Sequence, residues 1–442
     1  MQQTFRQRIM SASFWTAGGF AAQKAFQLGS NLVLTRLLFP EAFGLMALAN
    51  VILIGLQMFS DVGIKPAIIQ NERGDDETFL NTAWTMQIGR GFALWLCACV
   101  LAYPASLLYG SPILFPLICV LGATAAINGF ASTSLATCER RLDVRRLTII
   151  QLLGQAVTLT VTAALCWLLN SVWALAYGGV AGALVSTIFS FVLMPTHRHR
   201  LLWDSNSVGA LARFGRWIFL STAITFMGGQ GLRGLQGVYL TPAELGIVTI
   251  AQTIAWMPGE LTAQIMNLVG FPALSEMRQR NRQEFERALK EMRIKVLALS
   301  IPMFIGVALL SGPIINIMYD DRYAAAGHYL AILALGGAVS VIPMGYQTAV
   351  MALGDTRLHF WIITVSMFFR IGAMVAGFYL GSVEGMLVGI GAGAMAGYAY
   401  VGLCAKRLRI FDFKADLVAL IVLAIATLAT WQVYTKLPAF LI

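Results

Sequence analysis

Long apolar segments alternate with short polar stretches along the whole chain. Most of these segments hold about 20 or more residues, the length that an α-helix needs to cross the hydrocarbon core of a bilayer. Barrel strands are shorter, and open sheets leave backbone groups unpaired in lipid, so the segments are predicted to be helices. The thirteen predicted spans are 12–37, 42–64, 80–104, 112–136, 147–169, 172–194, 214–238, 243–270, 294–318, 326–352, 358–380, 383–405 and 416–436.

A short repeat divides this series of spans into two halves. Residues 39–44 (FPEAFG) and 241–246 (TPAELG) both place a proline, three residues and a glycine at the start of an apolar helix. The two copies of the repeat are separated by six spans. Because six is an even number of crossings, the halves would share one orientation and be related by an axis along the membrane normal. The fold class expected is an all-α polytopic membrane protein with two six-helix lobes in parallel pseudo-repeat around a central cavity, plus one or two extra C-terminal spans.

The predicted domain boundaries follow from this count. Residues 1–200 would form the first lobe with spans one to six, and residues 201–405 the second lobe with spans seven to twelve. Residues 406–442 would add one further span. The mixed charges at 271–293 are typical of a solvated or interfacial helix, here a cytoplasmic loop that joins helices of the second lobe.

Composition agrees with a membrane protein and excludes a nucleic-acid partner. Only 12% of the residues are charged and 58% are hydrophobic, whereas soluble domains carry roughly 25% charged residues. The net charge is +10, but 24 of the 31 Lys and Arg residues fall in cytoplasmic segments if the N-terminus is cytoplasmic, and three fall outside. This bias is the positive-inside rule of membrane proteins, and it sets the expected orientation.

No motif predicts an enzyme, a cofactor or a metal site. The six cysteines lie in or at the ends of apolar spans, and Cys97-x-Cys99 has no second ligand pair nearby. Gly389, Gly393 and Gly397 are spaced by four within an apolar span, which predicts close helix packing rather than a nucleotide loop. The first span contains several polar residues and is too long for a signal-peptide core, so we expect it to stay.

Among the charged residues of the predicted spans, four cations and two acids are the candidates for a function. A charge at the centre of a bilayer costs roughly 2.5 to 3.5 kcal/mol on insertion scales, so each of these residues needs a function or a partner. The excess of positive charge favours an anionic ligand, and the planar arginine fork suits phosphate. The cations expected to bind substrate are Lys24, Arg90, Arg233 and Arg370, and the acids expected to gate the cavity or couple an ion are Asp61 and Glu260.

Polar stripes on the first two helices of each repeat predict where these charges point. A membrane helix turns a polar face toward protein or water, not toward acyl chains. We therefore place the stripes around one shared cavity. Its expected polar lining comprises Gln27, Asn31, Asn50, Gln57, Gln236, Trp256 and Gln264.

The same residues also allow a structural interpretation. Lys24 with Asp61, and Arg233 with Glu260, would make salt bridges between neighbouring helices. Arg370 would bond to backbone carbonyls, and Arg90 would extend toward the cytoplasmic interface. Bridges and substrate contacts are compatible, since gates often use ion pairs.

Several segments resemble a known family. Residues 35–45 (TRLLFPEAFGL), 59–64 (FSDVGI), 67–70 (AIIQ) and 80–84 (LNTAW) are similar to the polysaccharide-exporter, or Wzx-like oligosaccharide flippase, family. This family belongs to the multidrug/oligosaccharidyl-lipid/polysaccharide (MOP) flippase superfamily. The resemblance implies two six-helix lobes, a cationic central cavity and alternating access. Its members usually have twelve or fourteen spans, so thirteen is a departure.

The resemblance also implies a substrate and partners. The substrate would be a polyprenyl-pyrophosphate-linked oligosaccharide, such as an exopolysaccharide, capsule or O-antigen repeat unit, moved to the periplasmic leaflet of a bacterial inner membrane. Partners would be membrane lipids and, as a further candidate, the polysaccharide polymerase or export machinery. The alternative is a multidrug cation antiporter of the same superfamily, which would require an unpaired acid in the cavity. A membrane-embedded glycosyltransferase would need a catalytic carboxylate or a large outer loop.

Overall fold

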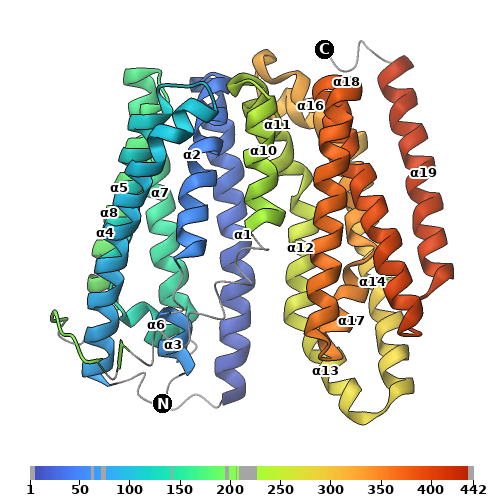
Figure 1. The fold of residues 1–442 in the computed structure, drawn as a ribbon, viewed down its shortest axis with the longest axis horizontal. Coiled ribbons are helices and arrows are strands. Elements are labelled where there is room, and N and C mark those ends of the chain that lie inside the picture. Colours follow the sequence, from blue (N-terminus) through green and yellow to red (C-terminus); the bar gives the residue numbers. More distant parts are fainter. Residues whose placement is uncertain are drawn as a thin grey trace. The chain divides into compact units, whose positions relative to one another are not determined.

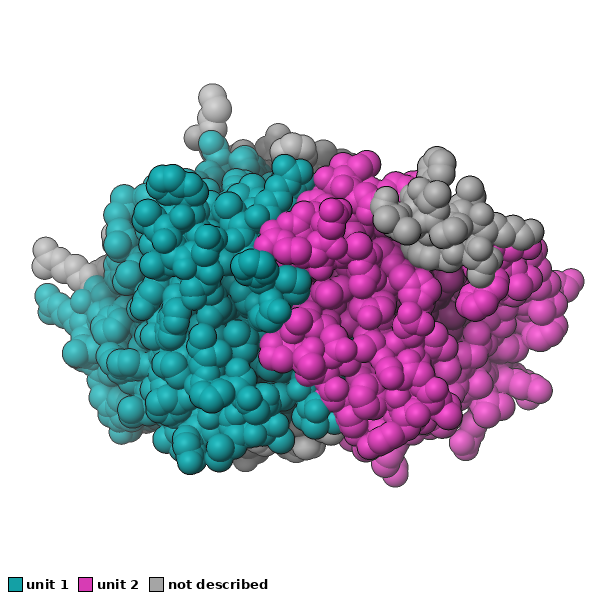
Figure 2. All heavy atoms as spheres, turned by 90° about the horizontal axis from the view of Figure 1, so that it is seen from above, with its two compact units in different colours: residues 1–238 teal, residues 239–442 magenta. Residues whose placement is uncertain are grey.

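A computed structural model describes residues 5–60, 64–70, 76–140, 143–194, 199–205, 207–208 and 226–436. Every regular element within these residues is a helix, as predicted (Figure 1). The chain divides into two compact units, residues 1–238 and 239–442 (Figure 2). The predicted lobe boundary at 200 precedes residues 209–225, which lie outside the described part, so that boundary remains a prediction.

Unit 1 contains long helices and two short ones. Its elements are α1 (Phe5–Leu37), α2 (Pro40–Phe59), α3 (Ile64–Gln70), α4 (Glu77–Leu108), α5 (Leu114–Gly129), α6 (Ser134–Arg140), α7 (Val144–Leu169), α8 (Trp173–Val192), a π-helix (Met227–Gly231) and α10 (Leu232–Tyr239). Helices α4 and α5 pack together, as do α7 and α8, α1 and α7, and α5 and α8. These pairs form the bundle that positions the site.

Unit 2 contains the remaining helices. They are α11 (Pro242–Ala255), α12 (Met257–Ile265), a π-helix (Met266–Gly270), α13 (Phe271–Arg280), α14 (Arg282–Leu309), α15 (Ser311–Met318), a 3₁₀ turn (Asp321–Tyr323), α16 (Ala325–Val341), α17 (Met344–Ala352), α18 (Thr356–Arg407) and α19 (Phe413–Lys436). The last helix packs against α14 and α16. It is therefore a part of unit 2.

The helices occupy the predicted spans. Among the described residues, eight helices are long and apolar enough to cross a membrane, or nine if α5 and α6, bent by 64°, count as one broken span. Non-helical backbone at Gly381 and Ser382 divides α18 between the predicted spans 358–380 and 383–405. The chain is thus a multi-pass membrane protein. The predicted span 214–238 falls partly outside the described residues, so the count of thirteen stays a prediction.

The repeated sequence begins a helix in each unit. Pro40 and Pro242 both occupy the first turn of their helices, where the missing N–H has no helical partner to lose. The residue before each proline is extended, and Thr241 forms a capping box with Glu244. The repeat therefore encodes the same helix start in α2 and α11.

Glycines bring the two halves of α18 into backbone contact. A Cβ at Gly389 would overlap the carbonyl of Ala373, and one at Gly393 would lie 2.5 Å from the Cα of Arg370. Gly377 and Gly385 approach each other in the same way. The close packing predicted for Gly389 and Gly393 is confirmed, and the halves form a tight hairpin.

This hairpin gives a stability prediction. We expect Gly389→Ala to destabilise the protein by about 1–3 kcal/mol, because the added methyl group must separate two backbones. The matched control is Gly372→Ala on the same helix, where a Cβ meets nothing within 4 Å. Thermal unfolding in detergent micelles compares the two variants, and equal midpoints would contradict the prediction.

Candidate functional site

Helices α1 and α7 meet along a seam of polar and small side chains. The guanidinium of Arg145 lies 5.4 Å from the centre of the Trp15 ring. One turn further along α1, a Cβ at Gly19 would lie 2.7 Å from Thr148, so the helices are close there. The Gln23 amide then donates to Gln151 Oε1 at 2.7 Å. These contacts hold the two helices together through Trp15, Gly19 and Gln23 of α1.

Beyond these contacts the seam opens into a cavity of about 520 Å³. We call it the Lys24 groove. Its polar lining includes Lys24, Gln27 and Asn31 of α1 with Gln155 and Thr158 of α7. The structure thus brings together three residues that the sequence analysis assigned to one cavity.

The described lining of the groove combines one cation with neutral hydrogen-bonding groups. Lys24 Nζ donates to Gln27 Oε1 at 3.1 Å and lies 5.6 Å from the centre of the Phe20 ring. Gln27 and Gln155 are exposed, and in a membrane such amides must face water or a polar ligand rather than acyl chains. An ammonium group binds phosphate as a point charge, and amides bind sugar hydroxyls. The groove can therefore hold a phosphorylated sugar.

Arg90 and Gln57 lie in a different cavity of unit 1, of about 510 Å³. Arg90 Nε donates to Ser60 Oγ at 3.1 Å, and Nη2 donates to the carbonyl of Gln57 at 3.0 Å. Arg90 thereby caps the C-terminal end of α2, where helix carbonyls lack backbone partners. It does not line the Lys24 groove.

Arg233 and Gln236 lie on α10, which packs against α2. A Cβ at Gly234 would lie 3.1 Å from Val51 Cγ1, and the hydroxyl of Tyr109 donates to the carbonyl of Gly234 at 3.3 Å. Gln236 is fully buried. Asn50, another predicted lining residue, is exposed on α2.

The predicted residues of unit 2 lie on α12 and α18. Trp256 directly precedes α12, Glu260 and Gln264 lie on it, and the first two are exposed. Arg370 Nη2 donates to Ser340 Oγ of α16 at 2.9 Å, while its buried Nε has no hydrogen-bond partner among the described residues. A membrane-embedded cation of this kind is a functional-site hypothesis.

Asp61 lies outside the described residues. The predicted bridge from Lys24 to Asp61 therefore remains a prediction. The predicted bridge from Arg233 to Glu260 also remains one, because these residues belong to different units. Within the described part of the chain, no group of three His, Cys, Asp or Glu side chains is arranged to hold a metal ion.

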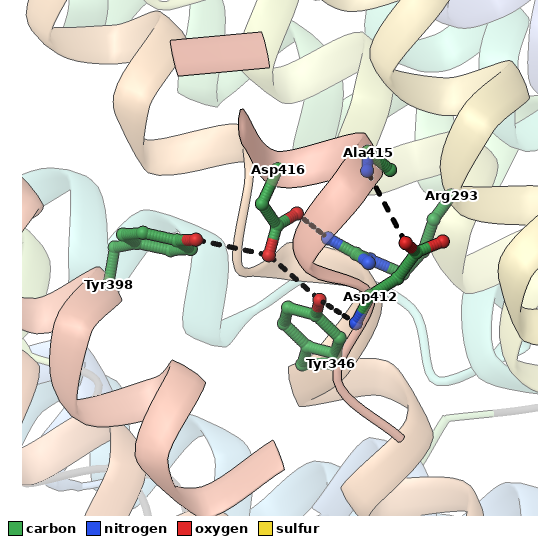
Figure 3. Close-up of polar contacts among 6 residues, drawn as sticks. All are labelled: Arg293, Tyr346, Tyr398, Asp412, Ala415 and Asp416. Atoms are coloured by element: carbon green, nitrogen blue, oxygen red, sulfur yellow. Dashed lines mark hydrogen bonds and ion pairs between the residues drawn. The ribbon is translucent and has the colours of Figure 1, made fainter. Parts of the chain in front are cut away.

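Unit 2 contains a buried ionic cluster that was not predicted from the sequence (Figure 3). Arg293 and Asp416 form an ion pair with side chains only 2% and 1% exposed. The hydroxyls of Tyr346 and Tyr398 both donate to Asp416 Oδ2, at 2.8 and 3.0 Å. The carboxylate thus joins α14, α17, α18 and α19.

The prediction that residue 293 ends a solvated segment was wrong, because Arg293 lies buried within α14. Its guanidinium carbon lies 3.6 Å from the centre of the Tyr346 ring. A Cβ at Gly345 would lie 2.5 Å from Arg293 Cγ, so the arginine also packs on the break between α16 and α17. The signal that could have found the pair was Asp416, an acid at the start of the last apolar span.

This architecture is shared with solved structures of membrane transporters. The fold is similar to that of the lipid II flippase MurJ in an inward closed conformation, with a TM-score of 0.75 and 13% identity over 95% of this chain and 93% of that one. It is also similar to an inward-facing multidrug resistance MATE transporter of the MOP superfamily, with a TM-score of 0.66 and 17% identity over 88% and 94% of the chains. The chain therefore has the fold of the MOP superfamily.

The chain belongs to the polysaccharide biosynthesis protein family, whose model matches residues 33–327. The succinoglycan biosynthesis transport protein ExoT of Rhizobium meliloti is 23% identical, over 84% of this chain and 75% of ExoT. The lipopolysaccharide biosynthesis protein WzxC of Escherichia coli is 22% identical, over 87% of this chain and 78% of WzxC. The family resemblance in the sequence is thus confirmed.

Proposed function

We propose that the protein is a flippase that moves a polyprenyl-pyrophosphate-linked oligosaccharide from the cytoplasmic to the periplasmic leaflet of a bacterial inner membrane by alternating access. The observation that carries the proposal is the Lys24 groove, a cation among amides within apolar helices. A pyrophosphate linked to sugars offers the two chemistries that such a lining binds. The name of ExoT, a succinoglycan biosynthesis transport protein, supports a transport function, and that of WzxC supports a part in lipopolysaccharide biosynthesis.

In this proposal each residue type has a separate task. Lys24 holds the pyrophosphate, and Gln27, Asn31 and Gln155 bind sugar hydroxyls. Arg233 and Arg370 supply further positive charge along the path of the anion. The exposed Glu260 is a candidate for gating or ion coupling.

The direction of transport follows from charge. The bias of Lys and Arg supports a cytoplasmic N-terminus. Two negative charges that move outward across an inside-negative membrane gain roughly 5 kcal/mol per 100 mV. The membrane potential thus favours export of the pyrophosphate.

A multidrug cation antiporter is the second candidate, because the fold is similar to that of MATE transporters. A cationic drug would need a carboxylate in its site. In the described part of the chain, no Asp or Glu lines the Lys24 groove. This groove therefore favours an anionic substrate.

Deletion of the gene tests the function directly. We expect a polyprenyl-pyrophosphate-linked repeat unit to accumulate in the cytoplasmic leaflet and the surface polysaccharide to be lost. Extraction of lipid-linked sugars with mass spectrometry gives the first result, and plasmid complementation is the control. Unchanged lipid-linked sugars together with greater sensitivity to cationic drugs would favour the antiporter instead.

A further inference from the structure

The segment that joins α18 to α19 carries four exposed cations. They are Lys406, Arg407, Arg409 and Lys414, and we call them the basic corner. Among the described residues, no acid forms an ion pair with any of these four side chains. The proposed function gives the basic corner no role.

The acids of the same segment already have partners. Asp412 Oδ1 accepts a hydrogen bond from the backbone N–H of Ala415 at 3.3 Å. Asp416 is buried in its ion pair with Arg293. The part of unit 2 outside the described residues, 437–442, contains no charged residue in its sequence. Within unit 2, the basic corner therefore has an excess of positive charge.

Contacts to the backbone hold the basic corner in a defined shape. Arg282 Nη2 donates to the carbonyl of Leu408 at 2.5 Å, and its Nε donates to Glu286 at 2.6 Å. The backbone N–H of Asp412 donates to the hydroxyl of Tyr346 at 2.9 Å. A surface that is fixed before a ligand arrives loses less conformational entropy on binding.

The helix ends account for two of the four cations but not for Lys414. Lys406 and Arg407 lie in the last turn of α18, where the helix dipole favours positive charge. Lys414 lies in the first turn of α19, where the dipole disfavours a cation. An anion bound at the basic corner would offset this unfavourable interaction.

An apolar stripe on α19 begins directly at Lys414. Positions 414, 418, 421 and 425 fall on one face of a helix, because their spacing follows whole helical turns. The last three are Val418, Ile421 and Ile425, and their side chains are exposed. The basic corner and this stripe therefore place cations next to a surface for hydrocarbon, which are the two requirements of an anionic phospholipid.

We propose that the basic corner and the apolar stripe of α19 bind an anionic phospholipid of the surrounding bilayer. Its phosphate lies at the corner, and its acyl chains lie along the stripe. The positive-inside rule explains on which side of a membrane such cations lie, but it does not give a preference for one lipid. The site belongs to unit 2 alone, and its occupancy does not depend on the proposed flippase activity.

Lipid titration of the full-length protein in a non-ionic detergent tests this site. Phosphatidylglycerol and phosphatidylcholine with the same acyl chains are compared, and native mass spectrometry gives the dissociation constant of the first bound lipid. The test variant removes three cations of the corner, with Lys406→Gln, Arg407→Gln and Lys414→Gln. The matched control removes the same charge from exposed positions of α13 and α14, with Arg280→Gln, Arg287→Gln and Lys290→Gln.

We expect phosphatidylglycerol to bind about tenfold or more tightly than phosphatidylcholine, since each cation near an anionic lipid surface contributes about fivefold. The test variant should lose most of this preference, and the control should stay within about twofold of the unmodified protein. Lys414→Gln alone should weaken phosphatidylglycerol binding by about fivefold, which serves if the triple variant does not fold.

A last measurement separates a lipid from a free phosphate. Millimolar glycerol 3-phosphate has the charge of a headgroup but no acyl chains, so it should not displace phosphatidylglycerol. Displacement would overturn the proposal in favour of a site for phosphate alone. Equal affinity for the two lipids, or an equal loss in the test variant and the control, would also overturn it.

Discussion

Asp416→Ala is expected to destabilise the protein by about 3–5 kcal/mol, the cost of removing one partner from a buried ion pair. The substitution leaves the charge of Arg293 uncompensated in a site where that side chain is 2% exposed. It also removes the acceptor of the Tyr346 and Tyr398 hydroxyls. Reversible unfolding in mixed micelles measures the loss.

Two further variants distinguish the loss of the buried ion pair from a non-specific loss of stability. Arg293→Met combined with Asp416→Leu removes both charges and should recover most of the stability, since apolar groups of similar volume often replace buried pairs without loss. Glu276→Ala is the matched surface control, because Glu276 pairs with Arg280 at 2.7 Å with both side chains more than half exposed. Such a pair contributes about 1 kcal/mol or less. Equal losses from Asp416→Ala and Glu276→Ala would refute the prediction.

Lys24→Ala is expected to abolish surface polysaccharide while the protein still inserts into the membrane. Among the described residues that line its groove, Lys24 is the one cation, so its loss leaves neutral amides that bind pyrophosphate weakly. Arg233→Ala should have the same effect if that residue contacts the substrate. Surface polysaccharide is measured together with the amount of protein in the membrane fraction.

Two controls define the outcome. Lys24→Arg keeps the charge and should retain part of the export. Lys290→Ala removes an exposed lysine of α14 and should leave export unchanged. Normal export by both Lys24→Ala and Arg233→Ala would show that the cavity assignment is wrong.

Local patterns in the sequence predicted the helices well. The length of the apolar segments predicted the spans, and the prolines at 40 and 242 marked where α2 and α11 begin. The spacing of Gly389 and Gly393 gave the tight hairpin. Each of these features depends on neighbours along the chain, which a single sequence records directly.

Long-range pairings and helix breaks could not be predicted in this way. Arg293 and Asp416 are 123 residues apart, and Gln23 and Gln151 are 128 apart. No periodicity links such positions, because their contact depends on how the helices pack. The predicted span 326–352 was also written as one helix, whereas the structure interrupts it before α17. Packing of Arg293 against Gly345 accompanies that interruption.

The hairpin of α18 has a mechanical consequence. Its two halves touch through backbone atoms at Gly377, Gly385 and Gly389, with no side chain between them that could change rotamer. Sliding one half past the other would therefore meet rigid carbonyl groups. In any rocking motion, residues 356–407 should move as one rigid body, and the guanidinium of Arg370 should move with them.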